Sequence, residues 1–330
     1  MAWKNSQDLI KKLSSSHANH SYHFAIHPQT AAQKHTPIMR TLGILLLLIL
    51  PLLNAQTTPA DIPTKGLVPL RKAPEVQFAF LCINQTTPAT TEALKASLVK
   101  WFQLKSPKDI HEFKFNQDSL AFSWRIGRSR FVATLETIPI PKDDIRYASN
   151  NSLHWPDAEK SMIAHKANYT ISCNSIHRIP WHATLDLTKA LAAFTETHDT
   201  AGLYWGDASI VHSPTSLTKQ AQYQHDSDAK VPTQLWVGLL FESDTKGGWN
   251  IFTDGMTPLG HRDIEIHSSQ LQRTQLFSFL NQLKHDVITR KVSLANDLLI
   301  EDPKGNEWKV TKGKSVIGKN APVWVLVPTN

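Results

Sequence analysis

The segment His261–His267 carries the densest group of side chains in this sequence that could do chemistry. If the segment is a strand, alternate side chains share a face, so Ile264 and Ile266 would enter the core and the polar side chains would point the other way. The polar set is His261, Asp263, Glu265 and His267. Imidazole and carboxylate groups on one surface could bind a divalent cation or act as acid and base.

The geometry of a strand limits this metal site. At roughly 3.3 Å per residue the four polar side chains extend over about 20 Å, so at most two neighbours could bind one ion. The other ligands would have to come from elsewhere in the chain, and Asp254 and His165 are the candidates. The alternative, which we expect, is a solvated polar face on a half-buried strand, because this is the usual strand pattern. No cofactor is predicted, and a divalent metal stays an open alternative.

Tryptophan is the second residue type that could form a site, because the chain has ten. Those on apolar periods, such as Trp124 and Trp236, are expected in the core. Those near turns or strand ends could form an exposed aromatic platform for a ligand. The platform candidates are Trp155, Trp205 and Trp249.

Common catalytic signatures are missing from the sequence. GxSxG, HExxH and GxGxxG do not occur, and these mark common hydrolases, zinc proteases and dinucleotide-binding proteins. Gly313–Asn320 resembles a phosphate-binding loop, but Asn320 replaces the hydroxyl residue and an apolar strand follows, so we expect a turn. Ser216 and Lys219 have the SxxK spacing of some acyl-transferring enzymes, but the accompanying SDN and KTG motifs are absent, so we expect a chance match.

The composition is that of an ordinary globular protein. The chain has 330 residues, 41% of them hydrophobic, and two cysteines, which are too few for a zinc cluster or a disulfide scaffold. The net charge is +7, but residues 1–55 account for +4 of it. The rest of the chain is nearly balanced, so we expect no nucleic-acid partner.

The amino-terminal region is typical of a secretory signal. Thr41–Leu53 is an apolar run of 13 residues, shorter than the roughly 20 residues of a membrane-spanning helix, so we predict no stable transmembrane anchor. Arg40 precedes the run and Ala55 follows it, as in a cleavable signal peptide. We therefore expect an exported protein, periplasmic or secreted, with a signal peptide over residues 39–55 and cleavage near Ala55.

The segments on either side of this signal show no apolar period. Residues 1–38 are interpreted as an upstream extension, with translation starting at Met39. A start at Met1, with a long signal or an uncleaved anchor, stays open. Residues 56–75 contain four prolines and are interpreted as an extended linker.

Export would place the two cysteines in an oxidising compartment, where they could pair. Cys82 and Cys173 each lie in a predicted buried strand. A disulfide could form if those strands are neighbours. Two buried thiols are the alternative, because free cysteine is a common core residue.

Hydrophobic periodicity predicts an α+β fold of antiparallel sheets with three to four packed helices. The main expected strands are 77–84, 113–115, 120–126, 130–137, 168–173, 201–206, 235–241, 249–253 and 261–267. The expected helices cover residues 90–102, 156–165 and 187–194 and a stretch from a capping box at Ser269 and Gln272 to Val287. Two strand-then-helix openings suggest two similar halves, 76–150 and 151–330, within one domain of residues 76–330.

Several short segments occur in the same order as in a known family. They are Ile138–Pro141, Trp155, Ala164–Ala167, Leu203–Gly206, Leu235–Val237, Thr253–Met256, Leu259–Gly260 and Asp263–Ile266. Over about residues 76–327 the chain resembles the bacterial family of domain of unknown function 4261 (DUF4261). The resemblance implies one folded domain and makes Gly255, Gly260 and Glu265 positions of interest, with Gly206 as a further structural glycine. It implies no reaction, and Asn168 stands where the family tends to have a histidine.

No set of residues in the sequence matches a known catalytic arrangement. The sequence therefore predicts an exported, non-catalytic binding or interaction module whose partner is an unidentified protein or small molecule. The alternative is a metal-assisted hydrolase with a site in Asp254–His267. Convergence of Asp254, His261 and Glu265 in one pocket would favour the enzyme.

Overall fold

The computed structural model describes residues 76–175, 180–223, 231–245, 247–317 and 321–329. The chain divides into two compact units, one of Pro63–Gly313 with Val323–Asn330 and one of Met1–Ile62 with Lys314–Pro322. Nearly all described residues belong to the first unit. The upstream extension, the signal peptide and the linker expected over residues 1–75 lie outside the described residues.

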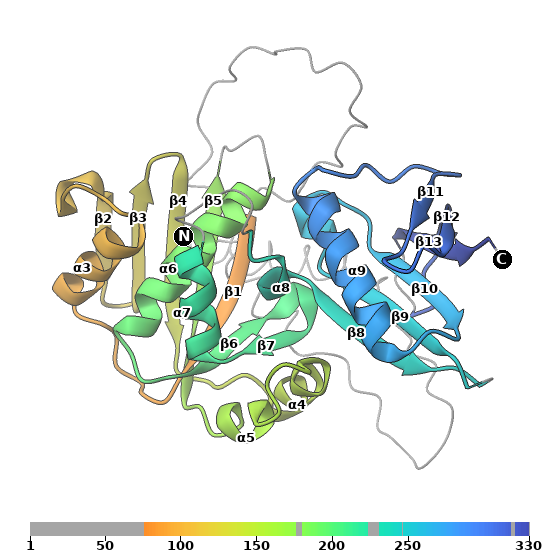
Figure 1. Ribbon diagram of the computed structural model, residues 1–330. Helices are drawn as coiled ribbons and strands as arrows, with labels where there is room; N and C mark the ends of the chain where they lie inside the picture. Colours follow the sequence, from red (N-terminus) through yellow and green to blue (C-terminus); the bar gives the residue numbers. More distant parts are fainter. Residues whose placement is uncertain (1–75, 176–179, 224–230, 246, 318–320, 330) are drawn as a thin grey trace, which may run out of the picture. The chain divides into compact units, whose positions relative to one another are not determined.

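Two sheets form the framework of this unit (Figure 1). Sheet A has the strand order β2-β3-β4-β5-β1-β6-β7, and sheet B has the order β11-β12-β13-β10-β9-β8. The strands of sheet A are β1 Val76–Ile83, β2 His111–Asn116, β3 Ala121–Ile126, β4 Ser129–Glu136, β5 Ala167–Ser175, β6 Thr200–Trp205 and β7 Ile210–His212. The strands of sheet B are β8 Gly238–Ser243, β9 Trp249–Asp254, β10 Ile264–Ser269, β11 Leu299–Glu301, β12 Glu307–Lys314 and β13 Pro322–Pro328.

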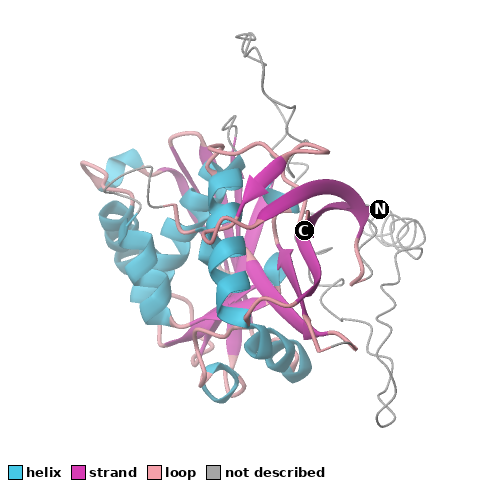
Figure 2. Ribbon diagram, turned by 45° about the vertical axis from the view of Figure 1, so that its right-hand side comes forward, coloured by secondary structure: helices cyan, strands magenta, loops and turns pink. Residues whose placement is uncertain are grey.

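Helices lie alongside the strands of both sheets (Figure 2). The α-helices of the described residues are α3 Thr91–Trp101, α4 Lys142–Asn151, α5 Ala158–Met162, α6 Pro180–Glu196, α7 Pro214–Tyr223, α8 Thr233–Trp236 and α9 Arg273–Ile288. All neighbouring strands of sheet A pair antiparallel. In sheet B, β8–β9, β9–β10 and β11–β12 are antiparallel, and β10–β13 is parallel. The predicted α+β class with antiparallel sheets is therefore confirmed.

Alternating apolar side chains build the β2-β3-β4 meander that the sequence predicts. Trp124 on β3 and Phe131 on β4 are both buried, and their rings stack at 5.0 Å between centroids. The neighbouring strands β5 and β1 are buried on both faces over most of their length, which explains their continuous apolar runs. Helices α3 and α6 pack against each other, and α6 also packs against β5, β1 and β4.

Strand β5 joins the two halves that the sequence suggested. It lies between β4 and β1 and pairs with both along most of its length. The expected boundary at residues 150/151 therefore falls inside the sequence of sheet A, whose strands run from Val76 to His212. The two similar strand-then-helix segments are β1 followed by α3 and β5 followed by α6, and both strands belong to sheet A.

The apolar stripe of helix α9 is predicted correctly from the sequence, but the start of the helix is not. The predicted stripe is buried as expected. Its members are Leu276, Leu280, Leu283 and Val287. The helix begins at Arg273, with the capping box at Gln272 and Gln275 instead of Ser269 and Gln272. A lysine, Lys284, is buried in the same stripe and is only 1% exposed.

Of the two alternatives left open for Cys82 and Cys173, the disulfide is not formed, although their strands are neighbours. Cys82 lies opposite Asn168, and Cys173 lies opposite Gln77. Five residues therefore separate the two cysteines along the pair, or about 17 Å at 3.3 to 3.4 Å per residue, and an odd spacing places them on opposite faces of the sheet. Both are buried free thiols.

No helix of the described residues is long and apolar enough to cross a membrane.

Candidate functional site

The predicted polar strand face is buried instead of solvated. Glu265 on β10 is 1% exposed, and its Oε2 lies 2.8 Å from Nε2 of His267, two residues along the same face. Ile264 and Ile266 are fully buried on the other side, as expected. The expectation of a solvated polar face is therefore wrong at Glu265, which lies on a strand with a paired neighbour on each side.

Asp263 closes the turn between β9 and β10. It lies before the strand begins and is 5% exposed. Its Oδ1 accepts hydrogen bonds from Thr253 Oγ1 and from the Met256 backbone N–H, both at 3.1 Å. Thr253 Oγ1 in turn accepts from the N–H of Ile264 at 2.7 Å. These contacts give Asp263 a structural role.

The other acid and histidine candidates lie in separate surroundings. Burial, and next the charge of Asp254, raise the pKa of Asp207, in the short 3₁₀ helix after β6, to about 6. Burial and the charge of Arg290 lower the pKa of His261 to about 4.

His165 has both ring nitrogens engaged by the backbone. Its Nε2 accepts from the N–H of Ile140 at 2.9 Å, and its Nδ1 lies 2.6 Å from the carbonyl oxygen of Met162. A carbonyl can only accept, so Nδ1 carries the proton, and burial lowers the pKa of this imidazole. His165 therefore connects the proline-rich Ile138–Pro141 segment to the end of α5.

The candidate residues do not converge on a metal. Within residues 76–329, leaving out the undescribed gaps, no group of three or more His, Cys, Asp and Glu side chains could hold an ion. No such group combines Asp254, His261 and Glu265 in that part of the chain.

The tryptophan candidates do not form one exposed platform. Trp205 is 3% exposed and belongs to the core. Trp155 and Trp249 are half-buried, and the guanidinium of Arg273 lies 5.6 Å from the Trp249 ring centroid. Trp124 and Trp236, expected in the core, are buried there.

Two of the three glycine candidates have a backbone that requires glycine. Gly255 has a φ of 108°, and a Cβ there would lie 2.5 Å from the carbonyl oxygen of Trp236. Gly260 ends the short 3₁₀ helix with a φ of 83°. Gly206 lies against the Phe80 ring, which a Cβ would approach to 3.4 Å.

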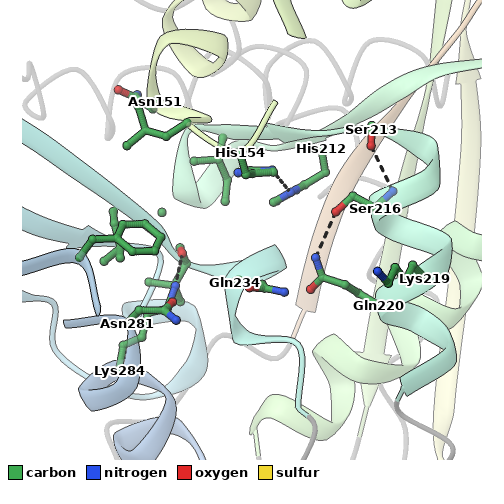
Figure 3. Close-up of a pocket in the computed structure, with 16 residues that line it drawn as sticks. Asn151, His154, His212, Ser213, Ser216, Lys219, Gln220, Gln234, Asn281 and Lys284 are labelled. Atoms are coloured by element: carbon green, nitrogen blue, oxygen red, sulfur yellow. Dashed lines mark hydrogen bonds between the residues drawn. The ribbon is translucent and has the colours of Figure 1, made fainter. Parts of the chain in front are cut away.

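A cavity lies away from these candidates, between segments of both sheets and their helices (Figure 3). Its volume is about 430 Å³, within the roughly 300 to 1,000 Å³ of small-molecule sites. Its wall combines the loop after α4, strand β7, and helices α7, α8 and α9, with the start of β8. The polar lining residues are Asn151, His154, His212, Ser213, Ser216, Lys219, Gln220, Gln234, Asn281 and Lys284.

Lys284 supplies the cavity with its buried cation. Its Nζ donates to the carbonyl oxygen of Val237 at 2.9 Å. Burial lowers the pKa of Lys284 from 10.5 to about 7. An ammonium has three N–H donors, and no carboxylate lines this cavity among the residues that the structure describes. Lys284 is thus a cation held in a polar cavity without a lining counter-ion from the described chain.

A histidine pair forms the wall next to α8. His154 Nε2 lies 2.8 Å from His212 Nδ1, and His212 Nε2 lies 3.2 Å from the carbonyl oxygen of Leu235. Because that carbonyl only accepts, His212 donates through Nε2 and receives the His154 proton at Nδ1. Burial is the main cause that lowers the pKa of both rings, and the charge of Lys284 lowers both further. The pair is therefore neutral near pH 7.

The first turns of α7 form a third wall that is rich in hydrogen-bonding groups. Ser213 caps the helix, with its Oγ accepting from the N–H of Ser216 at 3.1 Å. Ser216 Oγ accepts from Gln220 Nε2 at 3.1 Å. Gln220 Oε1 is buried and has no hydrogen-bond partner among the described residues. In Figure 3 the side chains of Gln220 and Gln234 point toward each other from opposite walls.

Apolar side chains complete the lining. Leu239 is buried, whereas Leu153 is 47% exposed and Phe277 is 41% exposed. A cavity with exposed apolar side chains on its wall and a buried cation offers an amphiphilic molecule both kinds of contact.

The sequence analysis missed this cavity. The signal that could have identified Lys284 is its position four residues after Leu280, in the middle of the apolar stripe of α9. The SxxK spacing of Ser216 and Lys219 is interpreted as a chance match and does not predict that both line a cavity. His154 and His212 are brought together by tertiary structure, because the Ser152 Oγ accepts from the Val211 N–H at 2.7 Å and so joins the loop after α4 to β7.

The fold and the cavity thus define an α+β protein with an internal polar cavity. Residues 252–327 match the model of a family described as domain of unknown function (DUF4261). The predicted resemblance to this family is confirmed over that segment, which includes α9 and Lys284. Searches of curated proteins and of solved structures found no match.

Proposed function

We propose that this protein is a non-catalytic binding module that holds a small molecule in the cavity between α7, α8 and α9. The observation that supports the proposal is Lys284, which is 1% exposed and lines the cavity with one hydrogen bond from its Nζ. Burying an amine that is incompletely hydrogen-bonded destabilises the folded chain. Residues that reduce stability in this way are typical of functional sites.

The rest of the wall supports a polar ligand. Gln220 Oε1 is an acceptor without a partner among the described residues, and a buried acceptor left without a donor costs about 1 to 3 kcal/mol. A ligand hydroxyl or amine would satisfy it. Gln234 and Asn281 add further amide groups to the lining.

The histidine pair supports binding over catalysis. His212 uses one ring nitrogen toward the carbonyl of Leu235 and the other toward His154. It therefore has no free nitrogen for a substrate. None of the catalytic candidates from the sequence lines the cavity.

A blocked variant tests this proposal. Ser216 is half-buried on the wall, so Ser216→Trp fills the cavity, and Ser278→Trp on the exposed side of α9 is the matched control. Thermal unfolding is measured with a panel of carboxylates, amines and neutral polar compounds at millimolar concentrations. We expect at least one compound to raise the Tm of the wild type and of Ser278→Trp but not of Ser216→Trp. If no compound of the three charge classes stabilises the wild type, the proposal is wrong.

We also propose that the protein is exported. The support is the apolar run Thr41–Leu53 with Arg40 before it and Ala55 after it. Amino-terminal sequencing of the protein recovered outside the cytoplasm should find a chain that begins just after Ala55. A mature chain that still contains Met39 would contradict this proposal.

A further inference from the structure

The charge of the cavity indicates what kind of molecule fits it. Lys284 is the fully buried cation of the wall, and no Asp or Glu lines the cavity among the described residues. Its charge also lowers the pKa of His154, His212 and His285. The field of the ammonium therefore extends over the cavity and its surroundings without a lining carboxylate to balance it.

A single negative charge would complement this arrangement. A buried ammonium is stabilised when an anion pairs with it and accepts its remaining N–H groups. One full negative charge neutralises the buried Lys284, whereas a phosphate would bring close to two. The second lysine of the lining, Lys219, is exposed, so solvent screens its charge. Among the described residues the lining contains no arginine, the residue whose planar fork suits phosphate best. A carboxylate fits the buried charge better than a phosphate does.

The apolar part of the lining indicates the rest of the molecule. Leu239, Leu153 and Phe277 provide aliphatic and aromatic surface, and the last two are 47% and 41% exposed. Apolar surface that stays in contact with water favours an apolar ligand group.

We propose that the ligand of the cavity is an organic monocarboxylate, whose carboxylate pairs with Lys284 Nζ and whose apolar body lies against Leu153, Leu239 and Phe277. This inference rests on the proposed binding function and specifies its ligand class. The carboxylate accepts from the N–H groups of Lys284 that the Val237 carbonyl does not use. Its charge keeps the amine protonated in the complex.

Matched probes test the inference by calorimetry on the full folded chain at pH 6.5. The probes are 3-phenyllactate and the neutral 3-phenyllactamide, which share the phenyl ring and a hydroxyl group and differ in charge. We expect phenyllactate to bind about 30-fold more tightly, the difference that a charge-assisted hydrogen bond makes. Equal or tighter binding of the amide, or no binding of phenyllactate at millimolar concentration, would overturn the inference.

Lysine variants identify the side chain that binds the negatively charged carboxylate of the ligand. Lys284→Met should weaken phenyllactate binding about 30-fold and leave amide binding nearly unchanged. Lys189→Met is the matched control, because Lys189 is also a partly buried lysine with a lowered pKa but lies outside the cavity lining. Unchanged phenyllactate affinity in Lys284→Met would contradict the assignment.

Proton uptake gives a readout that a purely structural lysine would not give. Burial lowers the pKa of Lys284 to about 7, so at pH 8 the free amine is mostly neutral. It should take up about 0.4 proton or more when a bound carboxylate raises its pKa by a pH unit or more. Burial lowers the pKa of the nearby His154, His212 and His285, so these stay neutral at this pH. Calorimetry in two buffers of different ionisation enthalpy measures the uptake, and Lys284→Met should abolish it.

The outcomes separate the two proposals. If the amide and the acid bind alike and Ser216→Trp removes both, the cavity is a ligand site but the carboxylate inference is wrong. If no probe and no panel compound binds, both proposals are wrong. Binding of phenyllactate that survives Ser216→Trp would place the acid elsewhere and overturn the inference.

Discussion

Replacing Lys284 by methionine should make the folded protein more stable. Burial lowers the pKa of this amine from 10.5 to about 7. Making the amine neutral at pH 7 costs about 1.36 kcal/mol for each pH unit below its ordinary pKa, so folding loses about 5 kcal/mol. Methionine has no such cost, but it leaves the Val237 carbonyl without its donor, which costs about 1 to 3 kcal/mol. We expect a net gain of about 2 to 4 kcal/mol.

The pH dependence of this gain identifies its cause. Between pH 7 and 10.5 the unfolded chain binds a proton at Lys284 that the native chain does not, so the stability of the wild type rises with pH over this range. The Lys284→Met variant lacks this group. The gain should therefore be fully present below about pH 7 and shrink as the pH rises from 7 to 10.5.

Urea unfolding at pH 7 and at pH 9.5 measures both effects. Lys291→Met is the control, because Lys291 is 57% exposed and 3.6 Å from Asp286, and surface pairs of this kind contribute about 1 kcal/mol or less. A Lys284→Met variant that is no more stable than the wild type at pH 7, or a gain that does not change with pH, would refute the reasoning.

Three further predictions concern the framework around the cavity. Asp263→Ala leaves two buried donors without an acceptor and should cost about 3 kcal/mol in urea unfolding, whereas a change under 1 kcal/mol would contradict the role of Asp263 in the turn. Gly255→Ala forces a Cβ to within 2.5 Å of the Trp236 carbonyl at a φ of 108° and should cost at least about 2 kcal/mol, and a variant as stable as the wild type would refute the close approach. Cys82 and Cys173 should both react with a thiol reagent only after unfolding, with a Tm that does not depend on reductant, and a lower Tm in reductant would indicate a disulfide.

Local sequence patterns predicted most of the fold. The period-two run of β3 and β4, and the apolar stripe of α9, depend on neighbours in sequence and are recovered to within a few residues. Strand pairing depends on segments that are distant in the sequence. The position of β5 between β4 and β1 could therefore not be predicted from the two similar strand-then-helix segments. The register that separates Cys82 from Cys173 was hidden for the same reason.

The candidate site was hard to predict because its members look ordinary in the sequence. Asp263 and Glu265 form a conspicuous polar pattern, but their side chains are used within the protein, toward the turn at Thr253 and toward His267. Lys284 is one lysine within a helix, and only burial of the whole stripe makes it unusual. Residue types indicate the chemistry that is available, and the tertiary fold decides which groups face a cavity.

The most direct test of the account is the titration of Lys284 itself. Nuclear magnetic resonance of lysine labelled at the ε position gives the pKa of this amine, with Lys284→Met assigning its signal. The account predicts a pKa near 7 in the free protein and a rise of at least about one pH unit when 3-phenyllactate is added. A pKa near the ordinary 10.5, or a low pKa that phenyllactate does not change, would contradict the claim that the cavity holds a carboxylate on Lys284.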